Sequence, residues 1–141
     1  MNMPEENVVE TLSQEEVWAF LGSQQLARLA FAIAGEPEIV PINYVVSDER
    51  IYFRTAEGSK LLGLTINARV ALETDRVGDG VATSVIVHGT ARELQTIDEL
   101  EWAEALPLRT WVPTRKVHFV EITPDELTGR RFHLGDGAPD A

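Results

Sequence analysis

The sequence predicts a mainly β fold, in which six or seven antiparallel strands close into a barrel and two or three short helices lie beside it. Apolar residues recur at every second position over residues 25–33 and again over residues 83–94, which is typical of strands with one buried face. Helix signals are few, and two capping-box patterns mark the starts of short helices. Because a closed barrel leaves no exposed sheet edges, it is the arrangement that we expect for so many strands.

The first half of the chain is expected to hold one helix, a hairpin and a third strand. Residues 1–10 are polar and acidic and should be flexible. Ser13 and Glu16 form a capping box that opens the helix. Pro41 cannot donate to a strand ladder, so it is expected at a sheet edge or at a bulge, where free backbone groups could meet a ligand. The expected strands cover residues 25–33, 38–46 and 51–55, with turns at residues 34–37 and 47–50.

The second half is expected to begin with a helix at residues 59–66. Residues 76–82 contain two glycines and an aspartate and are expected to form a mobile loop. Gly89 should mark a bend within a long strand. A second capping box, Thr96 with Glu99, opens another short helix. The remaining strands are expected at residues 70–74, 83–94, 116–122 and 127–132, with an extended connection at 106–115, a turn at 123–126 and a flexible tail at 134–141.

Length and composition limit the functions open to this chain. At 141 residues it is one domain, which we place at residues 11–133. A net charge of −11 argues against general binding to nucleic acids or anionic membranes. No apolar run approaches the ~20 residues of a membrane span. The absence of cysteine excludes thiol catalysis and is compatible with a reducing compartment, so we expect a cytoplasmic protein.

Side chains that could catalyse a reaction by themselves are not evident in the sequence. His88, His118 and His133 lack the spacing of a metal site, and we expect no bound metal. There is no nucleophile elbow, Walker loop or dinucleotide-binding glycine pattern. If the chain is an enzyme, a cofactor is therefore expected to carry the electrons.

One stretch of the chain, residues 50–69, is basic. Arg50, Arg54, Lys60 and Arg69 stand against a single acid, Glu57, which gives this stretch a net charge of +3 within a chain of −11. The basic side chains could bind an anion together, or they could simply face water. Both interpretations are open at this point.

The order of residues in this stretch favours a phosphate. Arg54 and Thr55 would end a strand, and Ser59 and Lys60 would open the next helix, whose N-terminus offers unpaired N–H groups and a positive dipole end. A guanidinium, an ammonium and two hydroxyl groups would then converge. Such a set of donors suits a phosphate group.

Two segments of the chain, PINYVV at residues 41–46 and IYFRTAEGSK at residues 51–60, resemble a known family. With the helix expected after them, they are similar to the flavin-binding split barrels of the pyridoxamine 5'-phosphate oxidase-like superfamily, and most closely to the small branch that includes nitroimidazole reductases. The resemblance covers roughly residues 10–132. It implies a six- to seven-stranded antiparallel split β-barrel that forms a homodimer, with flavin mononucleotide (FMN) in a cleft between the two subunits.

The resemblance also implies which residues contact the cofactor. One segment would run beside the flavin ring, a second would hold the phosphate, and a tryptophan would line the cleft from the other subunit. Trp102 and Trp111 each have a second interpretation, as an amphipathic core or interface side chain. The residues that the resemblance assigns to the cofactor are Pro41, Ile42, Asn43, Tyr44, Arg54, Thr55, Ser59, Lys60 and Trp111.

The sequence departs from the family in two respects. The C-terminal substrate-binding motif of the true pyridoxamine phosphate oxidases is absent, so that activity is not expected. No histidine aligns with the one found near the flavin of nitroimidazole reductases. Three hypotheses remain: an FMN-dependent oxidoreductase that transfers a hydride to or from a small organic substrate, a reductase that uses the deazaflavin coenzyme F420, and a flavin- or haem-binding carrier or sensor without turnover.

Overall fold

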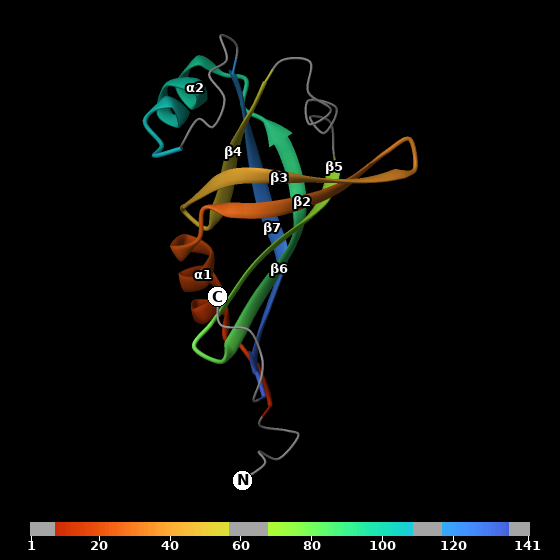
Figure 1. The fold of residues 1–141 in the computed structure, drawn as a ribbon. Helices are drawn as coiled ribbons and strands as arrows, with labels where there is room; N and C mark the ends of the chain where they lie inside the picture. Colours follow the sequence, from red (N-terminus) through yellow and green to blue (C-terminus); the bar gives the residue numbers. More distant parts are fainter. Residues whose placement is uncertain (1–7, 57–67, 109–116, 136–141) are drawn as a thin grey trace.

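The computed structural model describes residues 8–56, 68–108 and 117–135, and within them it confirms the expected split β-barrel of six to seven antiparallel strands (Figure 1). The expected helix at residues 59–66 lies outside the described residues. The elements that the structure describes are β1 (Val9–Thr11), α1 (Gln14–Ser23), β2 (Leu26–Ile33), β3 (Glu36–Ser47), β4 (Arg50–Ala56), β5 (Ala68–Gly78), β6 (Val81–Glu93), α2 (Ile97–Glu104) and β7 (Val117–His133).

Six of these strands form a closed ring. In the order β7-β4-β3-β2-β5-β6 each strand pairs with the next, and β6 and β7 also pair with each other as they run along the length of the molecule (Figure 1). β1 lies outside the ring and pairs with the far end of β7, where Val9 is opposite Phe132. Val9 and Glu10 are thus strand residues within the ten N-terminal residues that we assigned to a flexible segment.

The barrel core is built from every second residue of the ring. α1 packs against this core with Val17, Phe20 and Leu21, the apolar face that the sequence predicts. Large side chains of the ring strands that are fully buried are Leu29, Ile51, Phe53, Leu72, Val85, Val87, Val120 and Ile122.

A second and smaller apolar cluster lies outside the barrel, under α2. We call it the outer cluster. It joins α2 to the outward faces of β4 and β7, and Val45 of β3 packs against it. Neither described helix has the length and apolar run that a membrane crossing requires. The buried residues of the outer cluster are Tyr52, Leu94, Ala103, Leu108 and Phe119.

The predicted capping box at the start of α1 is confirmed. The Ser13 hydroxyl accepts a hydrogen bond from the Glu16 N–H at 3.1 Å, and the Glu16 carboxylate accepts one from the Ser13 N–H at 3.0 Å. The helix is held against β7 by backbone contact, since the Leu12 N–H donates to the Gly129 carbonyl at 2.9 Å. A Cβ at Gly129 would lie 2.8 Å from a Leu12 methyl group and 2.9 Å from a Val17 methyl group, so a side chain there would force these buried residues to move.

The prediction of a mobile loop at residues 76–82 is wrong, because these residues form a tight hairpin. β5 continues to Gly78 and β6 begins at Val81, so only Asp79 and Gly80 lie between the strands. Both residues have positive φ angles, 54° and 73°, as a two-residue type I′ turn requires. Asp-Gly is a strong hairpin signal.

The prediction of a turn at residues 123–126 is also wrong, because β7 is one continuous strand of 17 residues. Pro124 lies opposite Gly89, and the register shifts beyond this pair, so Asp125 is an extra residue of a β-bulge. Proline is tolerated at a bulge because the ladder is interrupted there. Gly89 lies at the register shift of the β6–β7 ladder, and a Cβ at this position would lie 2.4 Å from the Thr123 carbonyl oxygen. The close approach of β7 explains the glycine, and the bend expected there stays a prediction.

β3 changes partner along its length, and this change creates the candidate site. Residues 36–43 pair with β2, whereas residues 44–47 pair with β4. Beyond the pair Tyr44–Phe53 the strands β3 and β4 therefore separate. Pro41 lies where β3 pairs with β2 alone, so its missing N–H can face the unpaired side. The predicted position of Pro41 at an edge is confirmed.

Candidate functional site

The candidate site is the outer face of β3 and β4 at the point where the two strands separate. Side chains alternate along a strand, so Asn43 and Val45 of β3 and Tyr52 and Arg54 of β4 share the outward face. Val45 and Tyr52 form a cross-strand pair on this face and pack with the outer cluster. Asn43 and Arg54 follow as the next outward positions along each strand. Two of the residues assigned from the sequence are thereby brought to one surface.

Three other assigned residues point into the barrel instead. The side chains of Ile42, Tyr44 and Thr55 are buried, with 5%, 3% and 6% of their surface exposed. Because Thr55 alternates with Arg54, its hydroxyl does not converge with the guanidinium as we expected. Only the backbone groups of these residues can face a ligand on the outer surface.

Asn43 lines a hollow of about 240 Å³ between β3 and the end of α1. The Nδ2 atom of Asn43 is buried, and it has no hydrogen-bond partner in the described part of the chain. None of the described residues that line the hollow carries a charged side chain. Its lining residues are Gly22, Gln24, Gln25, Asn43, Tyr44, Val45, Val46 and Pro107.

Tyr44 holds the wall of this hollow in place from the inside. Its hydroxyl donates to the Leu21 carbonyl oxygen at 2.7 Å, at the end of α1, and its backbone N–H donates to the Gln25 carbonyl oxygen at 3.0 Å. Burial raises the pKa of Tyr44 to about 12, so the phenol stays protonated and remains a donor at neutral pH. The segment between α1 and β2 is thus fixed against β3.

Arg54 is half-buried over the ring of Phe119, with its guanidinium carbon 5.3 Å from the ring centroid. The basic stretch that the sequence predicts is not a single cluster. Arg50 lies at the β3–β4 turn and Arg69 on β5, and each forms an ion pair with an aspartate. Of the three arginines, which are the described residues of this stretch's basic set, Arg54 is the one on the outward face beside Asn43.

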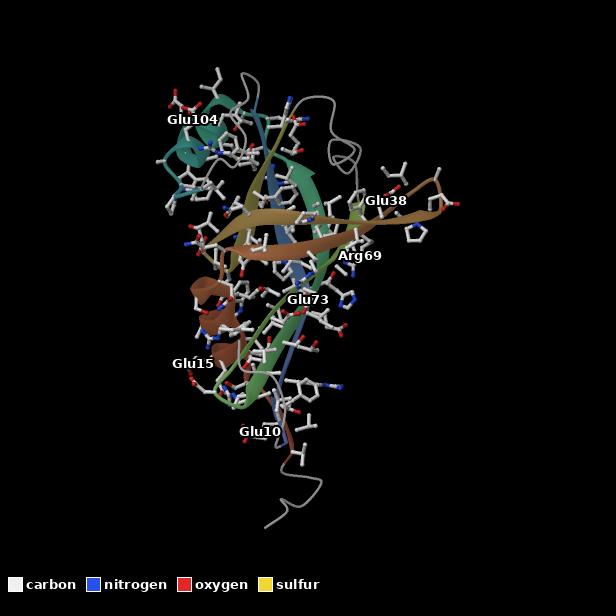
Figure 2. All side chains as sticks on the ribbon, in the orientation of Figure 1. Glu10, Glu15, Glu38, Arg69, Glu73 and Glu104 are labelled. Carbon is white, nitrogen blue, oxygen red and sulfur yellow. The ribbon has the colours of Figure 1, made fainter. Side chains whose placement is uncertain are left out.

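The acidic side chains are spread over the whole molecule. Figure 2 shows Glu10 near one end, Glu73 in the middle and Glu104 at the other end. The net charge of −11 is therefore not concentrated at the candidate site.

A hydrogen-bonded network on the outer face was not anticipated from the sequence. Tyr52 donates to Glu121 Oε2 at 2.9 Å, and Arg92 Nε donates to Glu121 Oε1 at 3.0 Å. Arg92 also donates to Glu99 Oε2 at 2.6 Å, which connects β6 to α2. Burial, followed by the hydrogen bond to Glu121, raises the pKa of Tyr52 to about 12. Alternation along residues 116–122 could have placed Phe119 and Glu121 on one face, but not their partners.

Trp102 lines a second hollow of about 340 Å³ beside this network. Its ring meets Tyr52 edge-on, with the centroids 4.9 Å apart and the planes at 67°. Nearly half of its surface is exposed. Trp102 is not among the residues that line the hollow beside Asn43. Asp98 and Leu94 complete the second hollow together with the network residues.

The remaining residues assigned from the sequence cannot be placed. Ser59, Lys60 and Trp111 lie outside the described residues, and their roles stay predictions. Two of the histidines lie near acids, His118 Nδ1 at 3.5 Å from Glu93 and His133 Nε2 at 2.9 Å from Glu10. Within the described ranges, no group of three or more potential metal ligands comes together.

Solved structures of proteins that are similar to this chain in sequence share its fold. A protein from Corynebacterium glutamicum, provisionally named a pyridoxamine 5'-phosphate oxidase, is 40% identical, with a TM-score of 0.85 over 96% of this chain and 98% of that one. An FAD-binding protein from Mycobacterium smegmatis is 38% identical, with a TM-score of 0.77 over 88% of this chain and 98% of that one.

A more distant solved structure shares only the fold. A protein from Bacteroides thetaiotaomicron, provisionally assigned to 5-nitroimidazole antibiotic resistance, is 16% identical with a TM-score of 0.68, over 88% of this chain and 89% of that one. At this identity the likeness concerns the fold alone. Residues 13–131 of the chain match the family model of pyridoxamine 5'-phosphate oxidase. With the barrel topology and the related structures, this match shows that the chain belongs to the pyridoxamine 5'-phosphate oxidase family.

Proposed function

We propose that this chain is a flavoprotein that binds FMN on the outer face of β3 and β4 and transfers a hydride to or from a small organic substrate. The observation that carries the proposal is the buried Asn43 Nδ2 without a partner in the described part of the chain. A buried donor without a partner is destabilising, and native structures contain few of them. A ligand carbonyl placed in the hollow would satisfy this donor, and the pyrimidine edge of a flavin ring presents such carbonyls.

The residues that line the hollow suit the uncharged pyrimidine edge of a flavin ring. Among the residues that the structure describes, those that line the hollow are uncharged, although the chain as a whole is strongly acidic. Val45 and Pro107 provide apolar contact, and Asn43 provides the donor. The similarity to an FAD-binding protein at 38% identity supports a flavin as the ligand.

Arg54 is proposed to hold the phosphate at the other end of the cofactor, together with Ser59 and Lys60 of the following segment. Charge-assisted hydrogen bonds from a guanidinium and an ammonium are the strong contacts by which proteins bind phosphate. FMN ends at this phosphate, whereas FAD continues beyond it. Binding of the two flavins can therefore be compared directly.

The bound flavin would supply the hydride chemistry, and the chain would bind, orient and shield it. A donor at a ring carbonyl gains strength as electron density on that edge increases, so Asn43 would favour the reduced flavin. The apolar side chains of Val45 and Pro107 would keep water from the same edge. The chain would therefore adjust the potential of the flavin through hydrogen bonding.

A second copy of the chain is proposed to form the other wall of the site. The hollow of about 240 Å³ is smaller than the ~300–1,000 Å³ of complete ligand sites. Leu26 lies opposite Asn43 and is 48% exposed, and Ile39 on the same outward face is 66% exposed. Covering these side chains in a twofold dimer would give two equivalent cofactor sites. Trp111 of the other subunit is the aromatic side chain that we expect there.

The absorbance spectrum of the small molecule released when the purified protein is denatured tests the proposal. Flavin bands, together with tighter binding of FMN than of FAD in a fluorescence-quenching titration, are the expected result. A single deazaflavin band or a haem Soret band would contradict FMN as the cofactor. If neither FMN nor FAD binds to the protein, flavin binding itself is refuted. Rapid mixing of the FMN-loaded protein with candidate hydride donors tests turnover, and light scattering tests the dimer.

A further inference from the structure

The aromatic ring beneath Arg54 has no assigned role. Arg54 and Phe119 are directly opposite each other in the β4–β7 ladder, and both point outward. The guanidinium carbon lies 5.3 Å from the centre of the Phe119 ring, within the ~6 Å range of cation–π attraction. This ring is therefore one of the contacts that determine where the guanidinium lies.

Phe119 itself is firmly held. Only 4% of its surface is exposed, and it packs in the outer cluster with Tyr52, Leu94 and Ala103. The Phe119 carbonyl accepts a hydrogen bond from the Leu94 N–H at 2.9 Å. Tyr52 of β4, Leu94 just after β6 and Ala103 of α2 thus fix this ring on a scaffold that is rigid compared with an arginine side chain.

We propose that Phe119 is a positioning residue, which holds the Arg54 guanidinium at the place where the cofactor phosphate binds. The inference rests on the proposed function, because it requires Arg54 to contact that phosphate. An aromatic face attracts the guanidinium without neutralising its charge, so the N–H groups of Arg54 can still donate to a phosphate. A long side chain that is already restrained loses less conformational freedom when the ligand arrives.

A second Arg–Phe contact in the same chain provides a matched control. The Arg76 guanidinium carbon lies 5.6 Å from the ring centroid of Phe20, an α1 residue that is buried against the barrel core. Phe20 is 8% exposed, close to the value for Phe119. Phe20→Leu therefore removes the same kind of contact and a similar buried ring, at a place where no phosphate is proposed.

The experiment compares dissociation constants of FMN and riboflavin for the wild type, Phe119→Leu and Phe20→Leu. Riboflavin lacks the phosphate, so the ratio of the two constants reports on phosphate recognition alone. Phe119→Leu should weaken FMN binding by roughly two- to tenfold, because an unrestrained arginine side chain loses that much more conformational freedom when the phosphate binds. Riboflavin binding should change by less than about twofold by the same reasoning, and Phe20→Leu should leave the ratio unchanged.

Two further variants separate positioning from packing. Phe119→Tyr keeps the aromatic face and should retain the wild-type ratio, and Phe119→Met fills the space without a ring if the leucine variant fails to fold. Equal losses for FMN and riboflavin, or an unchanged ratio in both Phe119→Leu and Phe119→Met, would overturn the positioning role while leaving flavin binding intact. A wild-type protein that binds neither flavin would overturn the proposed function, and the positioning role with it.

Discussion

Replacing Asn43 by leucine should change stability and flavin binding in opposite directions. Asn43 Nδ2 is buried and has no partner in the described part of the chain, so the apoprotein bears the desolvation of this amide without a compensating hydrogen bond. Leucine has nearly the same shape and no polar atoms. The apoprotein of Asn43→Leu should therefore be more stable than the wild type, whereas the loaded protein should lose a contact.

The magnitude follows from the cost of an unsatisfied buried group, about 1–3 kcal/mol. We take the lower end, about 1 kcal/mol, because Asn43 as a residue is only half-buried. For a chain of this length, that corresponds to a rise in melting temperature of about 4 °C. Loss of one hydrogen bond to the ring should weaken flavin binding by about 1–1.5 kcal/mol, or roughly tenfold.

Thermal unfolding of the apoprotein and fluorescence titration with FMN measure the two effects. Gln14→Leu is the control, because the Gln14 Nε2 does have a partner and donates to the Leu127 carbonyl at 2.8 Å. That substitution should lower the melting temperature and leave FMN binding unchanged. If Asn43→Leu destabilises the apoprotein and binds FMN normally, the Asn43 amide does not donate to the flavin. Our inference that the hollow binds the flavin ring would then be refuted.

Further expectations concern the phosphate, the bulge and acid stability. Arg54→Ala and Lys60→Ala should each weaken FMN binding by about 1.5–3 kcal/mol with little effect on riboflavin; equal losses for both ligands would contradict phosphate recognition. Gly89→Ala should destabilise the fold by at least 1–3 kcal/mol in urea denaturation, because its Cβ would lie 2.4 Å from the Thr123 carbonyl oxygen; an unchanged midpoint would refute the need for glycine. Hydrogen bonds from His133 and then Arg131 lower the pKa of Glu10 from 4.5, so their stabilisation is present above pH 4.5 and is lost as the pH falls through the lowered pKa. Glu10→Gln should consequently show a smaller fall in melting temperature below that pH. If melting temperature depends on pH identically in the variant and the wild type, the stabilising role of the Glu10 carboxylate is contradicted.

Local signals in the sequence were sufficient to predict much of the fold. The capping boxes at Ser13 and Thr96 are confirmed, because each depends on residues three positions apart and on little else. Strand alternation and the edge position of Pro41 were predictable for the same reason. The hairpin at Asp79-Gly80 was also within reach of the sequence, since both turn residues favour positive φ.

The candidate site was only partly predictable. The segments that hold Asn43 and Arg54 were identified from their resemblance to a family, and the structure places these two side chains on one face. The same strands turn Tyr44 and Thr55 inward, because a strand gives alternate residues to opposite faces and the register decides which face is buried. The pairing of Arg69 with Asp125 was hidden, since the two residues are far apart in the chain.

The sequence by itself therefore determined the local elements of this protein, because caps, turns and alternation depend on neighbouring residues. The tertiary structure decided which strands meet and at which register, since these depend on the closure of the whole barrel. In the closed barrel, β7 continues through Pro124 because a bulge at this point lies opposite Gly89 of β6. The tertiary structure also set Phe119 beneath Arg54, a contact between residues 65 positions apart that no short-range rule specifies.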